Sequence, residues 1–196
     1  MRKVSVNVYQ FDELSDDAKK KALENLRYVN VDGACDDWYK WTIEDFKADL
    51  SLAGFMADNV RFTGFCSQGD GASFTGKVVN FKEFCKKTGF RFPVNHDKLM
   101  TIDLDIRISR QDWRYCHKYT VSANIYGYDN TNTDEVNGAM ALERFVNDWE
   151  VEQADILYSK LEQEYDCLTS DDEVIETIKA NKWEFNSNGK IWRDKQ

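Results

Sequence analysis

The chain has 196 residues, of which 42% are apolar and 14% aromatic, and this composition predicts a folded protein with a sizeable core. No apolar run reaches the roughly 20 residues of a membrane-spanning helix, so we expect no membrane partner. The formal charge of −9 makes the protein acidic, and the five scattered cysteines predict reduced thiols in the cytoplasm. From the chain length we expect one domain over residues 1–196.

The N-terminal part of the chain predicts one strand and two helices. Alternating valines predict a strand over residues 4–8. Ser15 is followed by two aspartates, a pattern typical of a helix N-cap, and apolar residues on one helical face follow. A second helix is predicted over residues 36–53 from the helical spacing of its apolar residues, and Gly54 is placed to end it.

The middle of the chain predicts two hairpins. Strands over residues 60–65 and 72–78 flank a Gln-Gly-Asp-Gly loop, which is typical of a tight connection. A short helix over 81–87 follows. Strict alternation then predicts strands over 100–109 and 119–125, which we expect to pair as a long antiparallel hairpin with one solvent-exposed face.

The C-terminal part predicts a long acidic helix over residues 134–167. Ser170, with Glu173 three residues later, predicts the capped start of another helix, and residues 185–191 predict a small terminal hairpin. These elements predict an α+β fold, in which an antiparallel sheet has helices packed on one face and a long acidic C-terminal helix.

The most unusual segment is the glycine-rich loop of the first hairpin, and it allows two interpretations. In the first, Gly69 and Gly71 supply positive φ angles and Asp70 bonds its own backbone, so that the segment is only a turn. In the second, backbone amides and hydroxyls hold a ligand. The segment is neither a P-loop nor a dinucleotide fingerprint, because a strand follows it where those motifs require a helix. The residues of the candidate ligand site are Ser67, Gln68, Gly69, Asp70, Gly71 and Ser73.

This loop also carries a resemblance to a known family. Phe62-x-Gly64-Phe65, followed by the run from Ser67 to Gly76, resembles a motif of uncharacterised phage and prophage proteins, and the opening run from Val8 to Ser15 is similar to theirs. The resemblance extends to about Asn80. Members are sometimes labelled as the antitoxin of a toxin–antitoxin stability system. The resemblance implies no catalytic residues.

Cysteine and histidine residues do not form a recognisable catalytic or metal site in this sequence. Cys66 lies in the loop, but neither His96 nor His117 is near it in sequence, so we predict a structural thiol. Cys116 precedes His117 directly, and adjacent strand residues point to opposite faces, which argues against a shared metal ion. We expect no catalytic residue, no metal and no cofactor.

Two aspartates of the predicted strand over 100–109 are a further candidate. Asp103 and Asp105 would lie on one strand face, at a spacing that suits paired carboxylates or a divalent metal. Arg107 continues the same row, and an acid–base ladder on a solvated sheet face explains the pattern equally well. We favour the ladder.

The acidic charge is concentrated near the C-terminus, with fourteen acids and two bases between Asp134 and Glu176. One interpretation is a solubilising surface. The other is a surface that attracts a basic protein by presenting carboxylates in place of phosphates. The residues of this candidate partner surface are Glu143, Asp148, Glu150, Glu152, Asp155 and Glu162.

These patterns lead to two functional hypotheses. The first is a non-enzymatic phage or prophage protein that binds and inhibits a basic host, toxin or defence protein through the acidic helix, as a nucleic-acid mimic. The alternative is a small-ligand or nucleotide-signal binding protein, or a weak hydrolase, that uses the glycine-rich loop. Direct nucleic-acid binding is not expected, because the net charge is negative and the usual motifs are absent. The sequence does not determine the oligomeric state.

Overall fold

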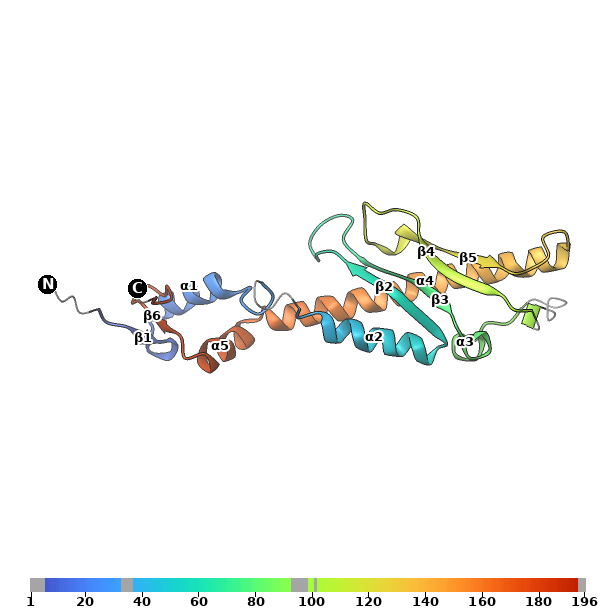
Figure 1. Cartoon of the computed structure of the whole chain (residues 1–196). Coiled ribbons are helices and arrows are strands. Elements are labelled where there is room, and N and C mark those ends of the chain that lie inside the picture. Colours follow the sequence, from blue (N-terminus) through green and yellow to red (C-terminus); the bar gives the residue numbers. More distant parts are fainter. Residues whose placement is uncertain (1–5, 33–36, 93–98, 101, 194–196) are drawn as a thin grey trace. The chain divides into compact units, whose positions relative to one another are not determined.

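The computed structural model describes residues 6–32, 37–92, 99–100 and 102–193. The chain divides into two compact units (Figure 1): unit 1 comprises Met1–Tyr39 and Gln163–Gln196, and unit 2 comprises Lys40–Glu162. The expectation of one domain over residues 1–196 stays a prediction. Among the described residues, no helix combines the length and the apolar character that crossing a membrane requires.

Unit 2 contains a four-stranded antiparallel sheet whose strand order follows the chain. The strands are β2 (Phe55–Phe62), β3 (Ala72–Val78), β4 (Asp105–Arg110) and β5 (Val121–Tyr126). Both predicted hairpins are confirmed, since β2 pairs with β3 and β4 pairs with β5.

The strand bounds differ from the prediction at two places. β2 begins earlier than residue 60 because Gly54, with φ of 76°, turns the chain directly from the preceding helix into the strand. β4 begins later than residue 100 because the partner strand ends at Tyr126, the partner of Asp105. Gly127, with φ of 91°, leaves the extended conformation of a strand, so the pairing stops at Tyr126.

Three helices pack on one face of this sheet: α2 (Lys40–Leu52), α3 (Phe81–Thr88) and α4 (Thr133–Leu168). Phe74 of β3 is fully buried, with its ring centre 5.4 Å from that of Phe46 in α2 and 6.0 Å from that of Trp149 in α4. The ring centre of Phe84 in α3 lies 5.0 Å from that of Trp149. The α+β class, with helices on a four-stranded sheet, is therefore confirmed.

The helix bounds agree best where local signals are strong. α4 extends one residue beyond the predicted range of 134–167 at each end, and α3 begins after Asn80, whose side chain accepts from the N–H of Glu83. α2 begins at Lys40, not at residue 36, because residues 37–39 form a turn. Residues 33–36 lie outside the described part of the chain.

Unit 1 contains β1 (Tyr9–Gln10), α1 (Asp16–Leu26), α5 (Asp171–Ala180) and β6 (Glu184–Phe185). The unit has a core of its own, in which the buried residues are Phe11, Leu14, Ala18, Ala22, Val174, Ile178 and Phe185.

The predicted helix caps of unit 1 are confirmed, but its first strand is not. The hydroxyl of Ser15 accepts from the N–H of Ala18, and the hydroxyl of Ser170 accepts from the N–H of Glu173. The prediction of a strand over 4–8 is wrong for residues 6–8, which form no strand, and residues 4–5 lie outside the described range. The strand is instead β1, which is short because β6 has only two residues to pair with it.

Candidate functional site

The loop over residues 63–71 is organised by the carboxylate of Asp70. Its Oδ2 atom accepts from the backbone N–H of Cys66 at 3.1 Å and of Ser67 at 2.7 Å. Gly69 has the predicted positive φ, at 96°. Gly71 does not, and its lack of a side chain has another reason: a Cβ atom there would lie 2.8 Å from the Cβ of His117. The turn interpretation is thus confirmed for Asp70 and Gly69 and wrong for the φ angle of Gly71.

Replacing Asp70 by Ala is expected to loosen this loop, because two backbone N–H groups lose their acceptor. The free energy of unfolding should fall by about 1 kcal/mol, and amide exchange at Ser67 should become faster. Hydrogen-exchange mass spectrometry of the loop peptide measures the effect. Asp70→Asn retains one side-chain oxygen and is the matched control. Equal protection in the Ala variant and the wild type would contradict this role.

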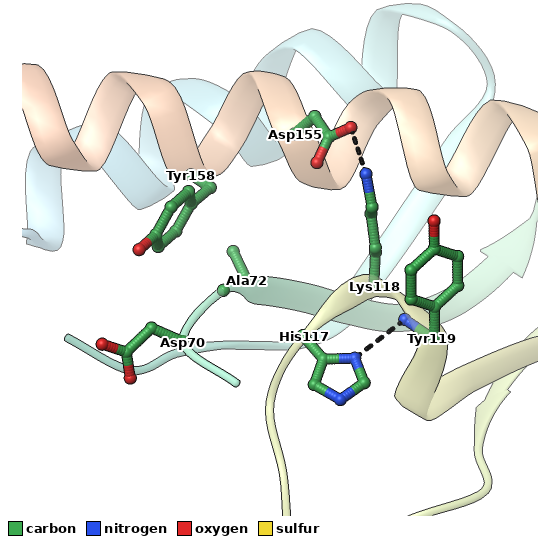
Figure 2. Close-up of a pocket in the computed structure, with 8 residues that line it drawn as sticks. Asp70, Ala72, His117, Lys118, Tyr119, Asp155 and Tyr158 are labelled. Atoms are coloured by element: carbon green, nitrogen blue, oxygen red, sulfur yellow. Dashed lines mark hydrogen bonds and ion pairs between the residues drawn. The ribbon is translucent and has the colours of Figure 1, made fainter. Parts of the chain in front are cut away.

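The loop forms one wall of a pocket of about 320 Å³. The second wall is the segment around a 3₁₀ turn (Lys118–Thr120), and the third is α4. Figure 2 shows Asp155 and Tyr158 extending from α4 toward the other two walls. The residues that line the pocket are Asp70, Gly71, Ala72, His117, Lys118, Tyr119, Asp155 and Tyr158.

Three contacts hold α4 against the other walls. The hydroxyl of Tyr158 donates to the backbone oxygen of Gly64 at 3.0 Å, and the ring of Phe65 lies 5.3 Å from that of Tyr158. The ammonium of Lys118 lies 2.5 Å from a carboxylate oxygen of Asp155. The bond to Asp155 raises the pKa of Lys118, so the ammonium stays charged at neutral pH.

His117 shapes the 3₁₀ turn. Its Nδ1 atom accepts from the backbone N–H of Tyr119 at 3.3 Å, and its backbone oxygen accepts from the hydroxyl of Thr120 at 2.6 Å. Because Nδ1 acts as the acceptor, the neutral ring carries its proton on Nε2, which can donate to a ligand. Tyr119 is 73% exposed and offers a ring face at the same turn.

Glu150 lies in the buried part of α4 and is not a surface residue as predicted. It is 3% exposed, and its Oε1 atom has no hydrogen-bond partner among the described residues. Val146 and Ala154, one helical turn to either side, are also buried, so all three belong to the inner stripe of the helix. Burial raises the pKa of Glu150 to about 8; Asp155 adds to the rise, and Arg110 and Lys118 oppose it.

Arg110 links the sheet to the 3₁₀ turn. Its guanidinium donates to the hydroxyl of Ser73 at 3.2 Å and to that of Thr120 at 3.1 Å. Ser73 is fully buried by this arrangement and does not line the pocket, so its assignment to an accessible ligand site is wrong. Of the other predicted loop residues, Asp70 and Gly71 line the pocket. Ser67, Gln68 and Gly69 are exposed outside its lining.

Residues 38–171 match the family model described as a domain of unknown function, DUF8835. The chain belongs to the DUF8835 family. The DUF8835 region contains the whole of unit 2, and therefore every residue of the pocket. Comparison with curated proteins finds no match, and comparison with solved structures finds none either. The resemblance to phage proteins stays a prediction.

The six acids predicted to form a partner surface occupy different environments in the DUF8835 region. Glu143, Asp148 and Glu152 are exposed, and Asp155 is exposed but bound to Lys118. Glu162 is half-buried and Glu150 is buried. The acids from Glu164 onward belong to unit 1. The carboxylates of the acidic segment are therefore divided between the two units, and not all of those in unit 2 are exposed.

The favoured acid–base ladder is present on β4. Asp105 accepts from Nε of Arg107 at 2.8 Å, and this bond lowers the pKa of Asp105. Asp103 lies before the strand begins, so the alternative of two carboxylates on one strand face is wrong. In the described residues, no three His, Cys, Asp or Glu side chains lie together as a metal site.

Four of the five cysteines fall within the described residues, and all four are free thiols: Cys66, Cys85, Cys116 and Cys167. Cys35 and His96 lie outside the described range. Burial raises the pKa of Cys85 to about 11, so its thiol stays protonated.

Proposed function

We propose that the DUF8835 region binds a small planar molecule in the pocket between the glycine-rich loop, the 3₁₀ turn and α4. The observation that carries this proposal is the pocket itself, in which three segments distant in sequence bring ionisable and aromatic side chains together. Its volume of about 320 Å³ is at the lower end of the range typical of ligand sites. A buried carboxyl group with a raised pKa, that of Glu150, lies close enough to two pocket residues to feel their charges, as is common near functional sites.

The lining indicates the chemistry of the ligand. The rings of His117, Tyr119 and Tyr158 provide flat surfaces on which an aromatic ring can stack. The carboxylates of Asp70 and Asp155 outnumber the single ammonium of Lys118, so hydrogen-bond donors are favoured over phosphate oxygens. A nucleobase, or another heterocycle with N–H groups, fits these conditions in size and polarity.

A thermal-shift screen of nucleobases, nucleosides and aromatic amines, followed by calorimetry, tests the proposal. A ligand that binds here should lose affinity roughly tenfold in Tyr119→Ala, because a stacking contact is removed. The loss should be similar in Asp155→Asn, because a charge-assisted hydrogen bond is removed. Tyr28→Ala, at an exposed tyrosine of unit 1, is the matched control and should bind normally. An empty screen, or equal affinity in all variants, would overturn the proposal.

A second candidate function has support from the exposed side of α4. Asp148 and Glu152 are one helical turn apart, and Ile156 follows one turn later with its side chain exposed. An acidic stripe beside an apolar residue suits a basic protein partner, as the first functional hypothesis from the sequence expected. Replacing Asp148 and Glu152 together by Lys should abolish the capture of a basic protein partner. In the wild type, added nucleic acid should displace that partner by competing with it. Unchanged capture would reject this function.

The matched control for that experiment is the charge reversal of Glu164 and Asp166 in unit 1, which changes the net charge by the same amount. If both double variants lose capture equally, the effect is one of total charge and not of the stripe on α4.

A further inference from the structure

The face of the sheet opposite the aromatic core carries a row of polar and basic side chains. Lys77 pairs with Arg107 across β3 and β4, and Arg107 pairs with Asn124 across β4 and β5. Met56 of β2 pairs with Lys77 on its other side. None of these four side chains is buried, whereas Ile106, next to Arg107, is fully buried. Because alternate strand residues point to opposite faces, the row lies on the solvent side.

A pocket of about 400 Å³ opens on this row. Lys77, Arg107, Arg110 and Trp113 are among its lining residues. Trp113 is 72% exposed, and the guanidinium of Arg110 lies 5.8 Å from the centre of its ring. Gly76 belongs to β3, the strand between β2 and β4, and it lines the pocket with its backbone alone. The site therefore combines an accessible indole with three cationic groups.

Positive charge exceeds negative charge at this pocket. Asp58 is the only acid that lines it among the described residues, and Lys77 makes no ion pair within them. The guanidinium of Arg107 lies 2.7 Å from a carboxylate oxygen of Asp105, and this ion pair neutralises part of the charge of Arg107. The stretch from the start of β2 to the end of β5 contains eleven bases and seven acids, so the formal charge of −9 arises elsewhere in the chain.

We propose that this face binds single-stranded nucleic acid, with a base stacked on Trp113 and phosphates held by Lys77 and Arg107. Positively charged surfaces with exposed aromatic rings bind single strands in this way, because every base has a ring face and every nucleotide a phosphate. A duplex would not satisfy the site, since its bases are already stacked and paired.

The negative net charge made nucleic-acid binding unexpected from the sequence, but the fold separates the opposite charges within unit 2. α4, which carries the acidic stripe, packs on the inner face of the sheet through Trp149, whose ring lies 6.0 Å from that of Phe74. Asp148 and Glu152 extend from the outer side of that helix. The row around Lys77 is on the other face, where the sheet lies between it and these carboxylates.

Fluorescence anisotropy with labelled oligothymidylate and oligouridylate at low salt measures this binding. We expect affinity that grows with strand length and falls steeply with salt. Trp113→Ala should weaken binding roughly tenfold, and Trp113→Phe should restore most of it, because the phenyl ring still offers a face on which a base can stack. Replacing Lys77 and Arg107 together by Gln should reduce the slope of log K against log salt by roughly one to two.

Matched controls come from the other face of unit 2. Trp41→Ala removes an indole that is 81% exposed on α2, and Arg144→Gln removes an exposed base on α4; both should bind as the wild type does. No binding at low salt would overturn the proposal, as would equal affinity for duplex and single strand. Mononucleotides that bind as tightly as long strands would also overturn it, because the strand would then add nothing.

Discussion

Glu150→Gln is expected to make the free energy of unfolding less dependent on pH and to stabilise the protein at alkaline pH. The carboxyl group has a folded-state pKa of about 8 against an ordinary value of 4.5. Between these values the unfolded chain has released this proton while the folded chain retains it. The wild type should therefore lose stability as pH rises from about 4.5 to about 8, by up to about 1.4 kcal/mol per pH unit.

Chemical denaturation at about pH 5 and about pH 9 measures the effect. The Gln side chain cannot ionise, so the variant should be more stable than the wild type at the higher pH, by an amount on the order of a few kcal/mol. Near the lower pH the two proteins should differ little. Arg110, Lys118 and Asp155 are the charged groups that act on Glu150, and they are the same in both proteins.

Glu152→Gln is the matched control, because it removes an exposed carboxylate from the same helix two residues away. Its stability should follow the pH dependence of the wild type. If Glu150→Gln also follows the wild type at both pH values, the buried carboxyl group does not hold its proton as proposed.

Phe74→Ala is expected to cause the largest loss of stability in unit 2. Phe74 is fully buried, and its ring lies between Phe46 of α2, Phe55 of β2 and Trp149 of α4. Truncation removes the contacts of three elements at once and leaves a cavity, which in protein cores costs about 3–5 kcal/mol. Thermal and urea denaturation followed by circular dichroism measure the change.

Trp41→Ala is the matched control, since it removes a larger aromatic ring from an exposed position on α2. Its stability should stay within about 0.5 kcal/mol of the wild type. A small effect of Phe74→Ala, comparable with that of the control, would mean that the aromatic core of unit 2 is not packed as described.

Local signals in the sequence predicted the elements whose hydrogen bonds are themselves local. Ser15 and Ser170 cap helices as expected, Gly54 follows the end of α2, and α4 matches its predicted range to within one residue at each end. The α+β class followed from the same patterns. At the two caps, the residues that decide the structure lie within one helical turn of one another.

The candidate site was only partly predictable. Asp70 and Gly71 were recognised in the loop, but Lys118, Tyr119 and Tyr158 were not connected with it, because no sequence spacing relates these residues. The burial of Glu150 had a signal in the sequence, since it lies at helical spacing from the apolar Val146 and Ala154. The prediction nevertheless placed Glu150 on the surface, because the residues near it in the chain are acidic.

By itself, the sequence determined the helices, their caps, the two hairpins and the concentration of acids near the C-terminus. Only the tertiary structure decided which acids remain exposed, where β4 and β5 stop pairing, and which side chains share the pocket. The physical reason is that strand pairing and burial depend on partners far away in the chain, whereas caps and turns depend on neighbours. Gly71 shows this difference: its loop was evident from composition, but the need for glycine comes from His117, which approaches from another hairpin.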